Sequence, residues 1–141
     1  MEQYIEFASN HPLMVFGTIG LIAFLIYYES DQLLSGIKGM NPPDLTRALN
    51  DGDAVLVDVR DGKSFKAGHI SGAIHIPSAE VVKRLSELKR HEGKTIAFCC
   101  NVGMTARSAA KAAKKAGLQN VAVLTGGLEA WNKANLPVVS R

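Results

Sequence analysis

The stretch of sequence that decides the fold is residues 95–117, TIAFCCNVGMTARSAAKAAKKAG. Residues 96–99 are apolar, as in a buried strand, while the alanine-rich part that ends at Gly117 is typical of a helix. Cys100 lies between the two, before a short loop around Gly103. Free backbone N–H groups and the positive end of a helix dipole meet at such a junction, and both favour a thiolate over a thiol. The pattern predicts a nucleophilic cysteine at residue 100.

The segments around this stretch alternate between strand and helix patterns. Apolar runs predict strands over 54–59, 74–76, 96–99 and 121–124. Helices are predicted after the capping residue Asn41, from Ser78 to about Leu88, from 104 to 116, and around Trp131, which we expect in the core. Strands that alternate with helices predict an α/β domain with a mostly parallel sheet and helices on both faces.

An apolar segment precedes this domain. Glu6 and Glu29 enclose 22 residues without a formal charge, and residues 12–28 are almost wholly apolar. A helix of that length reaches about 33 Å, enough to cross a hydrocarbon core of about 30 Å. We therefore predict an N-terminal tail over 1–11, a transmembrane helix over 12–28, a connector over 29–39 and the folded domain over 40–141.

Two other interpretations of the apolar segment are open, a cleaved signal peptide and a buried core helix. The first eleven residues contain no Lys or Arg, and Tyr27-Tyr28-Glu29 is a poor cleavage site. A core helix normally carries a polar stripe, and residues 16–25 have none. A single-pass membrane anchor, as in a bacterial inner membrane, is favoured.

The charges predict an orientation and exclude one class of partner. All sixteen Lys and Arg residues follow the apolar segment, so the positive-inside rule places the domain in the cytoplasm and the N-terminus outside. The net charge of the chain, +3, is mild. The clusters of Lys and Arg residues indicate solvated helix faces or attraction to an anionic membrane surface. No aromatic residues are interleaved with them, which argues against nucleic-acid binding. In a reducing compartment Cys99 and Cys100 are expected to be free thiols.

Further motifs extend along the whole domain. They are Leu56-Val57-Asp58-Val59-Arg60, Phe65, Gly68-His69-Ile70, Gly72-Ala73-Ile74, Ile76-Pro77, the Cys100 loop, Gly117-Leu118, Val121, Leu124, Gly126-Gly127, Ala130-Trp131 and Leu136-Pro137-Val138. In this order and spacing they resemble the rhodanese-like domain family over roughly residues 40 to 140. The resemblance implies a parallel sheet flanked by helices, with an active loop between a strand end and a helix start. Active members carry sulfane sulfur on the loop cysteine as a persulfide, taken from thiosulfate or another donor and passed to a thiophilic acceptor.

The resemblance also implies the site residues. Cys100 lies seventeen residues before Gly117, the spacing of the family's nucleophile, and the active loop is then Asn101, Val102, Gly103, Met104 and Thr105. Asp58 and Arg60 are implied as supporting residues that organise the loop. Active members usually carry arginine where this chain has Thr105, and an arginine there would help to hold an anionic donor. The departure disfavours thiosulfate as the donor.

Three other features of the sequence suggest competing chemistries. Cys99 is expected to pack inertly in the strand, although a pair of adjacent thiols could resolve a persulfide or bind a soft metal. His69 and His75 show no tight ligand spacing with the cysteines, so neither a metal nor a cofactor is expected. A tyrosine-phosphatase loop would need arginine where this chain has Ala106.

Together these patterns predict a membrane-anchored sulfurtransferase or persulfide carrier that acts through Cys100. Its partners would be a small sulfur donor and either a thiol acceptor or a protein. The alternative is a non-catalytic binding module of the same family at the cytoplasmic face of a membrane, which the missing loop arginine favours.

Overall fold

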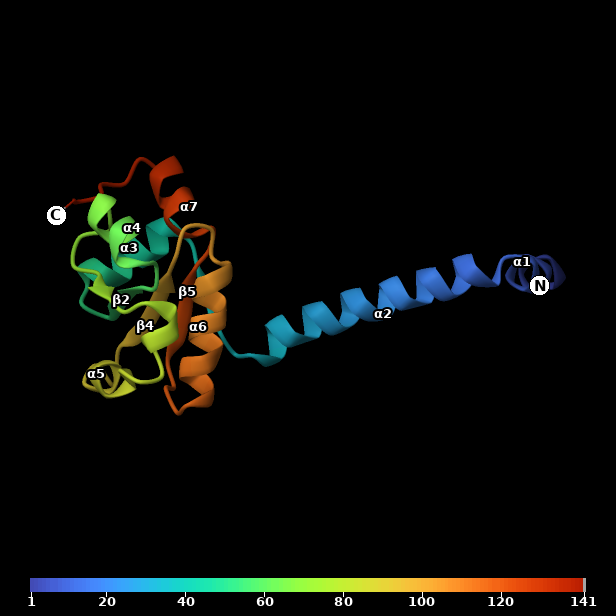
Figure 1. Ribbon diagram of the computed structural model, residues 1–141, viewed down its shortest axis with the longest axis horizontal. Helices are drawn as coiled ribbons and strands as arrows, with labels where there is room; N and C mark the ends of the chain where they lie inside the picture. Colours follow the sequence, from blue (N-terminus) through green and yellow to red (C-terminus); the bar gives the residue numbers. More distant parts are fainter. Residues whose placement is uncertain (141) are drawn as a thin grey trace. The chain divides into compact units, whose positions relative to one another are not determined.

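The computed structural model describes residues 1–140, apart from the side chains of Gln32 and Leu34. The chain divides into two units, residues 1–36 and the domain that begins at Ile37. The first unit contains α1 (Glu2–Asn10) and α2 (Pro12–Leu34). The domain holds the other helices and the sheet (Figure 1).

Helix α2 extends beyond the apolar segment. It continues to Leu34, whereas the sequence predicted a membrane helix that ends at residue 28. By length and composition its part Pro12–Asp31, 20 residues with a mean hydropathy of 1.7, could cross a membrane. Signal sequences and buried core helices share these properties. This part of α2 is therefore a candidate span.

The domain is built on a parallel sheet. Within the described residues five strands pair in the order β1-β5-β4-β2-β3, and every pair is parallel. The strands are β1 (Lys38–Met40), β2 (Ala54–Asp58), β3 (Ile74–His75), β4 (Thr95–Cys99) and β5 (Val121–Leu124). The helices are α3 (Pro42–Asn50), α4 (Gly62–Ala67), the 3₁₀ helix η1 (Ser78–Glu80), α5 (Leu85–Lys89), α6 (Met104–Lys115) and α7 (Gly127–Lys133). The predicted α/β architecture is confirmed.

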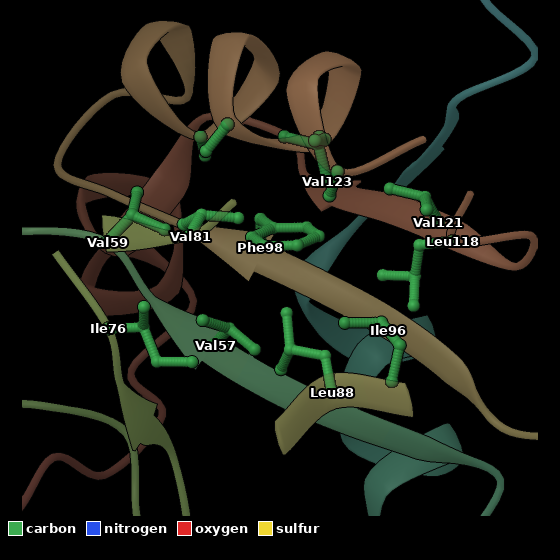
Figure 2. Packing of buried hydrophobic residues seen from close by; sticks show 14 of the residues in the cluster. Val57, Val59, Ile76, Val81, Leu88, Ile96, Phe98, Leu118, Val121 and Val123 are labelled. Atoms are coloured by element: carbon green, nitrogen blue, oxygen red, sulfur yellow. The ribbon is translucent and has the colours of Figure 1, made fainter. Parts of the chain in front are cut away.

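Alternation along the strands creates two apolar layers, one on each face of the sheet. In β4, Ile96 and Phe98 pack with the alanines of α6 and with Leu88 of α5, as Figure 2 shows in part. Ala97 and Cys99 point to the opposite face, where Leu45 of α3 and Trp131 of α7 lie. The remaining buried members of the first layer include Val57, Val59, Ile76, Val81, Leu118, Val121 and Val123. Trp131 is buried, as predicted.

The domain begins earlier than the predicted boundary at residue 40. Ile37 is buried, and β1 pairs with β5 in the register Lys38 to Ala122 and Met40 to Leu124. Residues 37–39 were predicted to belong to the connector, because a strand of three residues with a lysine and a glycine has no recognisable apolar pattern. A fragment that keeps the sheet complete must therefore start at or before residue 36.

The helix predicted from Ser78 to about Leu88 is interrupted. Residues 78–80 form η1, turns follow, and only α5 is regular helix. Val81 is buried, but Val82 is exposed. Two adjacent β-branched residues have low helix propensity, which explains why the chain makes turns here. The helix predicted after Asn41 does form, and the Asn41 side chain accepts a hydrogen bond from the Asp44 N–H at 2.9 Å.

Candidate active site

Cys100 is the first residue after β4, at the carboxyl end of the sheet where open α/β folds place their sites. Its Sγ accepts a hydrogen bond from the Gly103 N–H at 3.0 Å and one from the Ala106 N–H at 3.4 Å. Both donors belong to the start of α6, so its dipole also points at the sulfur. The two N–H groups and the helix N-terminus therefore meet at the sulfur, which is the geometry that the sequence pattern predicted.

Gly103 makes this geometry possible. It precedes α6 with a φ of 100°, in the region where residues with a side chain are strained. This turn directs its N–H toward Sγ. Met104 and Thr105 already belong to α6, and the second donor, Ala106, lies one residue beyond the loop that the sequence predicted.

Helix α7 holds the loop from the other side. The Leu128 N–H donates to the Cys100 carbonyl oxygen at 2.8 Å, and the Glu129 N–H donates to that of Asn101 at 3.0 Å. A Cβ on Gly127 would overlap the Cys100 oxygen and lie 2.6 Å from the Asn101 oxygen. The Gly126-Gly127 pair, visible in the sequence as part of the family pattern, therefore allows the backbone of α7 to approach the loop closely.

Cys100 is 4% exposed and opens into a pocket of about 330 Å³. The pocket is lined by Val59, Arg60, Asp61, Ser78, Cys100, Asn101, Val102 and Thr105. Three of the predicted loop residues, Asn101, Val102 and Thr105, thus line the pocket with the thiol. Ser78 and Val59 come from other elements, and no local motif marked them as site residues.

Asp58 and Arg60 form a buried ion pair next to the loop. The Arg60 Nη2 donates to Asp58 Oδ2 at 2.7 Å and to the Gly68 carbonyl oxygen at 2.7 Å, while its Nε donates to Asp58 Oδ1 at 3.0 Å. The hydrogen bond to Asp58 raises the pKa of Arg60. Asp58 is opposite Cys99 in the β2–β4 register, so its side chain shares the face away from Cys100. The ion pair therefore connects the end of β2 to the backbone at Gly68.

The charges around the pocket do not favour a dianion. Among its described lining residues, only Arg60 has a cationic side chain, and that guanidinium is engaged with Asp58. Asp61 contributes a carboxylate whose pKa is lowered by hydrogen bonds from the Ser64 N–H and hydroxyl. Thr105 occupies the position where a loop arginine would stand. The pocket is therefore polar but offers no free cation from these residues.

Cys99 is separated from this chemistry. It is 1% exposed in the opposite layer, and burial, together with the Asp58 carboxylate, raises the pKa of its thiol. A protonated thiol beneath the sheet is a poor nucleophile.

We therefore expect iodoacetamide at pH 8 to modify Cys100 and to leave Cys99 unmodified in the folded protein, as read by peptide mass spectrometry. Cys99→Ala should leave the reaction of Cys100 with iodoacetamide unchanged, because the Cys99 side chain contributes only packing. Modification of Cys99 in the folded protein, or a slower reaction of Cys100 in a folded Cys99→Ala protein, would contradict this separation of the two thiols.

The two histidines serve the structure. The Phe65 ring stacks between His69 and His75, at centroid distances of 3.8 and 4.5 Å. His75 Nε2 is 2.8 Å from the Arg60 carbonyl oxygen, and His69 Nδ1 is 2.8 Å from that of Phe65. Each ring is thus anchored to the backbone. Within residues 1–140, no cluster of three or more His, Cys, Asp or Glu side chains suited to a metal ion is found.

The sequence pattern of the rhodanese-like domain family matches residues 41–134. The chain belongs to this family. YibN, an uncharacterized protein of Escherichia coli K12, is 32% identical over 140 residues, which cover 99% of this chain and 98% of YibN. The likeness to YibN thus includes the N-terminal unit as well as the rhodanese-like domain.

Solved structures agree with this assignment. A rhodanese-related protein from Thermoplasma volcanium is 27% identical with a TM-score of 0.66, covering 74% of this chain and 99% of its own. The rhodanese-like domain therefore occurs as nearly the whole of a folded chain. The thiosulfate sulfurtransferase of Pseudomonas aeruginosa, 24% identical with a TM-score of 0.67 over 81% of this chain and 22% of its own, shares the fold.

Proposed function

We propose that this rhodanese-like protein is a sulfurtransferase or persulfide carrier that acts through Cys100 and is tethered to a membrane by α2. The observation that carries the proposal is the pair of N–H groups, from Gly103 and Ala106, directed at the sulfur of a cysteine that opens into a pocket. In nucleophilic catalysis, hydrogen-bond donors that are already in place stabilise the negative charge that the reacting atom gains and loses. The family match supports the same chemistry.

The reaction has two displacement steps. The Cys100 thiolate attacks the outer sulfur of a donor R–S–SH; a new S–S bond forms, the old one breaks, and the R–S⁻ thiolate leaves with the electron pair. A nucleophilic acceptor, cyanide or a thiolate, then attacks the outer sulfur of the Cys100 persulfide. That S–S bond breaks and Cys100 returns as a thiolate, stabilised again by the Gly103 and Ala106 N–H groups.

A fragment of residues 36–141 provides the test. It should be incubated with glutathione persulfide as the donor, freed of small molecules and analysed by intact mass spectrometry. We expect a gain of about 32 Da on one cysteine, which cyanide removes as thiocyanate. A fragment that remains reactive to iodoacetamide at Cys100 but never gains sulfur would refute the proposed function.

Thiosulfate is expected to be a poor donor because the pocket lacks a free cation among its described lining residues. Thr105→Arg would place a guanidinium beside Cys100, where two charge-assisted hydrogen bonds to the donor become possible. We expect KM for thiosulfate to fall by about tenfold or more, measured as thiocyanate formation. Ser86→Arg, which adds the same charge on α5, should leave KM unchanged.

If Thr105→Arg leaves thiosulfate unused while glutathione persulfide is a good donor, the missing cation is not what limits thiosulfate. If no donor loads either protein, the second candidate function gains support, a binding module without catalysis. The observation that favours that candidate is the threonine itself, because a module that only binds has no need for an anion-holding arginine.

The tether is proposed from α2. Its span Pro12–Asp31 has the length for a bilayer, and the nearest basic residues after it, Lys38 and Arg47, favour a cytoplasmic domain. The full chain should sediment with membranes and resist alkaline carbonate extraction, and a reporter active only in the cytoplasm should be active when fused after Arg141. Release of the chain by carbonate would refute the tether. Activity at the same fusion point of a reporter that works only outside the cytoplasm would refute the orientation.

A further inference from the structure

The thiol pocket continues into a second hollow. This hollow has a volume of about 420 Å³ and is lined by Ser78, Ala79, Met104, Thr105, Ser108, Ala109 and Ala112. Because Ser78 and Thr105 line both, the two hollows adjoin and form one groove between η1 and α6. The groove leads away from Cys100 along the helix.

The lining of the groove is uncharged within the residues that form its second hollow. The residues that line its far part are small or uncharged, chiefly the alanines at positions 79, 109 and 112 and the hydroxyls of Ser78, Thr105 and Ser108. In the described part of the chain, neither the Ser78 nor the Thr105 hydroxyl has an intramolecular hydrogen-bond partner. These hydroxyls can donate to carbonyl oxygens and accept from N–H groups of a bound molecule.

Two exposed apolar side chains flank the entrance. Val102 in the loop is 54% exposed, and Met104 at the start of α6 is 77% exposed. Methionine is polarizable and adaptable, and it is used often at surfaces that bind peptides. A small inorganic acceptor would fill only the thiol pocket and would leave Met104 and the far part of the groove uncovered.

We propose that the sulfur acceptor is a polypeptide, an extended segment whose cysteine thiol lies over Cys100 and whose neighbouring residues occupy the groove. The groove wall from Thr105 to Ala112 is eight residues of helix, and the seven steps between its ends span about 10 Å. An extended chain rises about 3.3 Å per residue, so this wall accommodates about three residues. The alternating amide groups of such a segment match the free hydroxyls, and its uncharged side chains match the alanines.

The inference rests on the proposed function and names its acceptor. The peptide thiolate attacks the outer sulfur of the Cys100 persulfide and forms a new S–S bond. The Cys100–sulfur bond breaks, its electron pair returns to Cys100 as a thiolate, and the peptide leaves as the persulfide R–S–SH, which keeps the proton of the outer sulfur. No oxidant or reductant is consumed.

The test separates the acceptor from the loading step. The fragment 36–141 is first loaded with sulfur and the persulfide verified by mass. Transfer is then followed to four acceptors: cyanide, N-acetylcysteinamide, and the two tetrapeptides acetyl-Cys-Ala-Val-Ala-amide and acetyl-Ala-Val-Ala-Cys-amide. Since the thiol is the same, we expect one of the two peptides to show a KM about tenfold below that of N-acetylcysteinamide, with a similar maximal rate.

A variant of the groove identifies where the peptide binds. Ser108 lines the far part of the groove but not the thiol pocket, so Ser108→Trp should raise the peptide KM about tenfold and leave transfer to cyanide unchanged. Ser86→Trp, an exposed serine on α5, is the matched control and should change nothing. If Ser108→Trp does not fold, Ala79→Trp on the opposite wall replaces it.

Each failure has a distinct meaning. Peptides that react no better than N-acetylcysteinamide, or that react equally well with the Ser108→Trp fragment, overturn the peptide acceptor and leave the persulfide chemistry intact. A fragment that never loads sulfur overturns the proposed function, and the peptide acceptor falls with it.

Discussion

Replacing Cys100 by serine should abolish sulfur loading and transfer altogether. The serine hydroxyl stays protonated at neutral pH and cannot hold a sulfane sulfur, while the Gly103 and Ala106 N–H groups keep their places. With a 36–141 fragment we expect a loss of at least about a thousandfold in thiocyanate formation, down to the rate without protein. Intact mass should show no added sulfur.

The matched control is Cys99→Ala, which changes the adjacent thiol on the other face of the sheet. It should load and transfer sulfur as the unchanged fragment does. Both fragments should unfold at urea concentrations close to the original one, so that a loss of activity is not a loss of folding. Turnover that survives Cys100→Ser would show that Cys100 is not the nucleophile and that another residue takes this role.

The second large effect is expected on stability, from Asp58→Ala. Asp58 is fully buried and Arg60 is 8% exposed, so the change leaves a guanidinium without its carboxylate inside the protein. Removal of one partner of a buried ion pair costs about 3–5 kcal/mol. Because domains of this kind have unfolding free energies of roughly 5–15 kcal/mol, Asp58→Ala should unfold the fragment at far lower urea.

The chain provides its own comparison in Glu87→Ala. Glu87 also accepts two hydrogen bonds from an arginine, Arg84, at 2.8 and 2.9 Å, but both side chains are partly open to water, at 37% and 42% exposure. Water replaces the lost partner there, so the urea midpoint should change little. Equal effects of Asp58→Ala and Glu87→Ala would show that the buried pair does not stabilise the end of β2.

Much of the fold could be predicted because its patterns are local. The apolar runs of β2, β4 and β5 are continuous, as strands covered on both faces require, and the alanines of α6 recur at helical spacing. The short strand β1 could not be predicted in this way. Its three residues become a strand only because β5 offers an edge to pair with, and that edge is distant in the sequence.

The candidate active site likewise has features that the sequence predicts and others that depend on the folded structure. Cys100 was predicted as the nucleophile from its place between a strand pattern and a helix pattern, and from the spacing to Gly117 that the family resemblance implies. Strand alternation explains why Cys99 faces away from it. The contribution of α7 was not foreseen. Its amides bond the Cys100 and Asn101 carbonyl oxygens across a long sequence separation, and only the folded backbone brings them together.

The order of the longer strands and helices, the position of Cys100 between a strand and a helix, and the apolar segment near the N-terminus are therefore determined by the amino-acid sequence itself. These features depend on the types of residues that are close together in the sequence, so they can be recognised without knowledge of the tertiary structure. The pocket, its lack of a free cation among the described lining residues and the groove along α6 arise only in the tertiary structure. Ser78 of η1 and Thr105 of α6 lie 27 positions apart in the sequence, and packing of η1 against α6 makes them walls of the same groove.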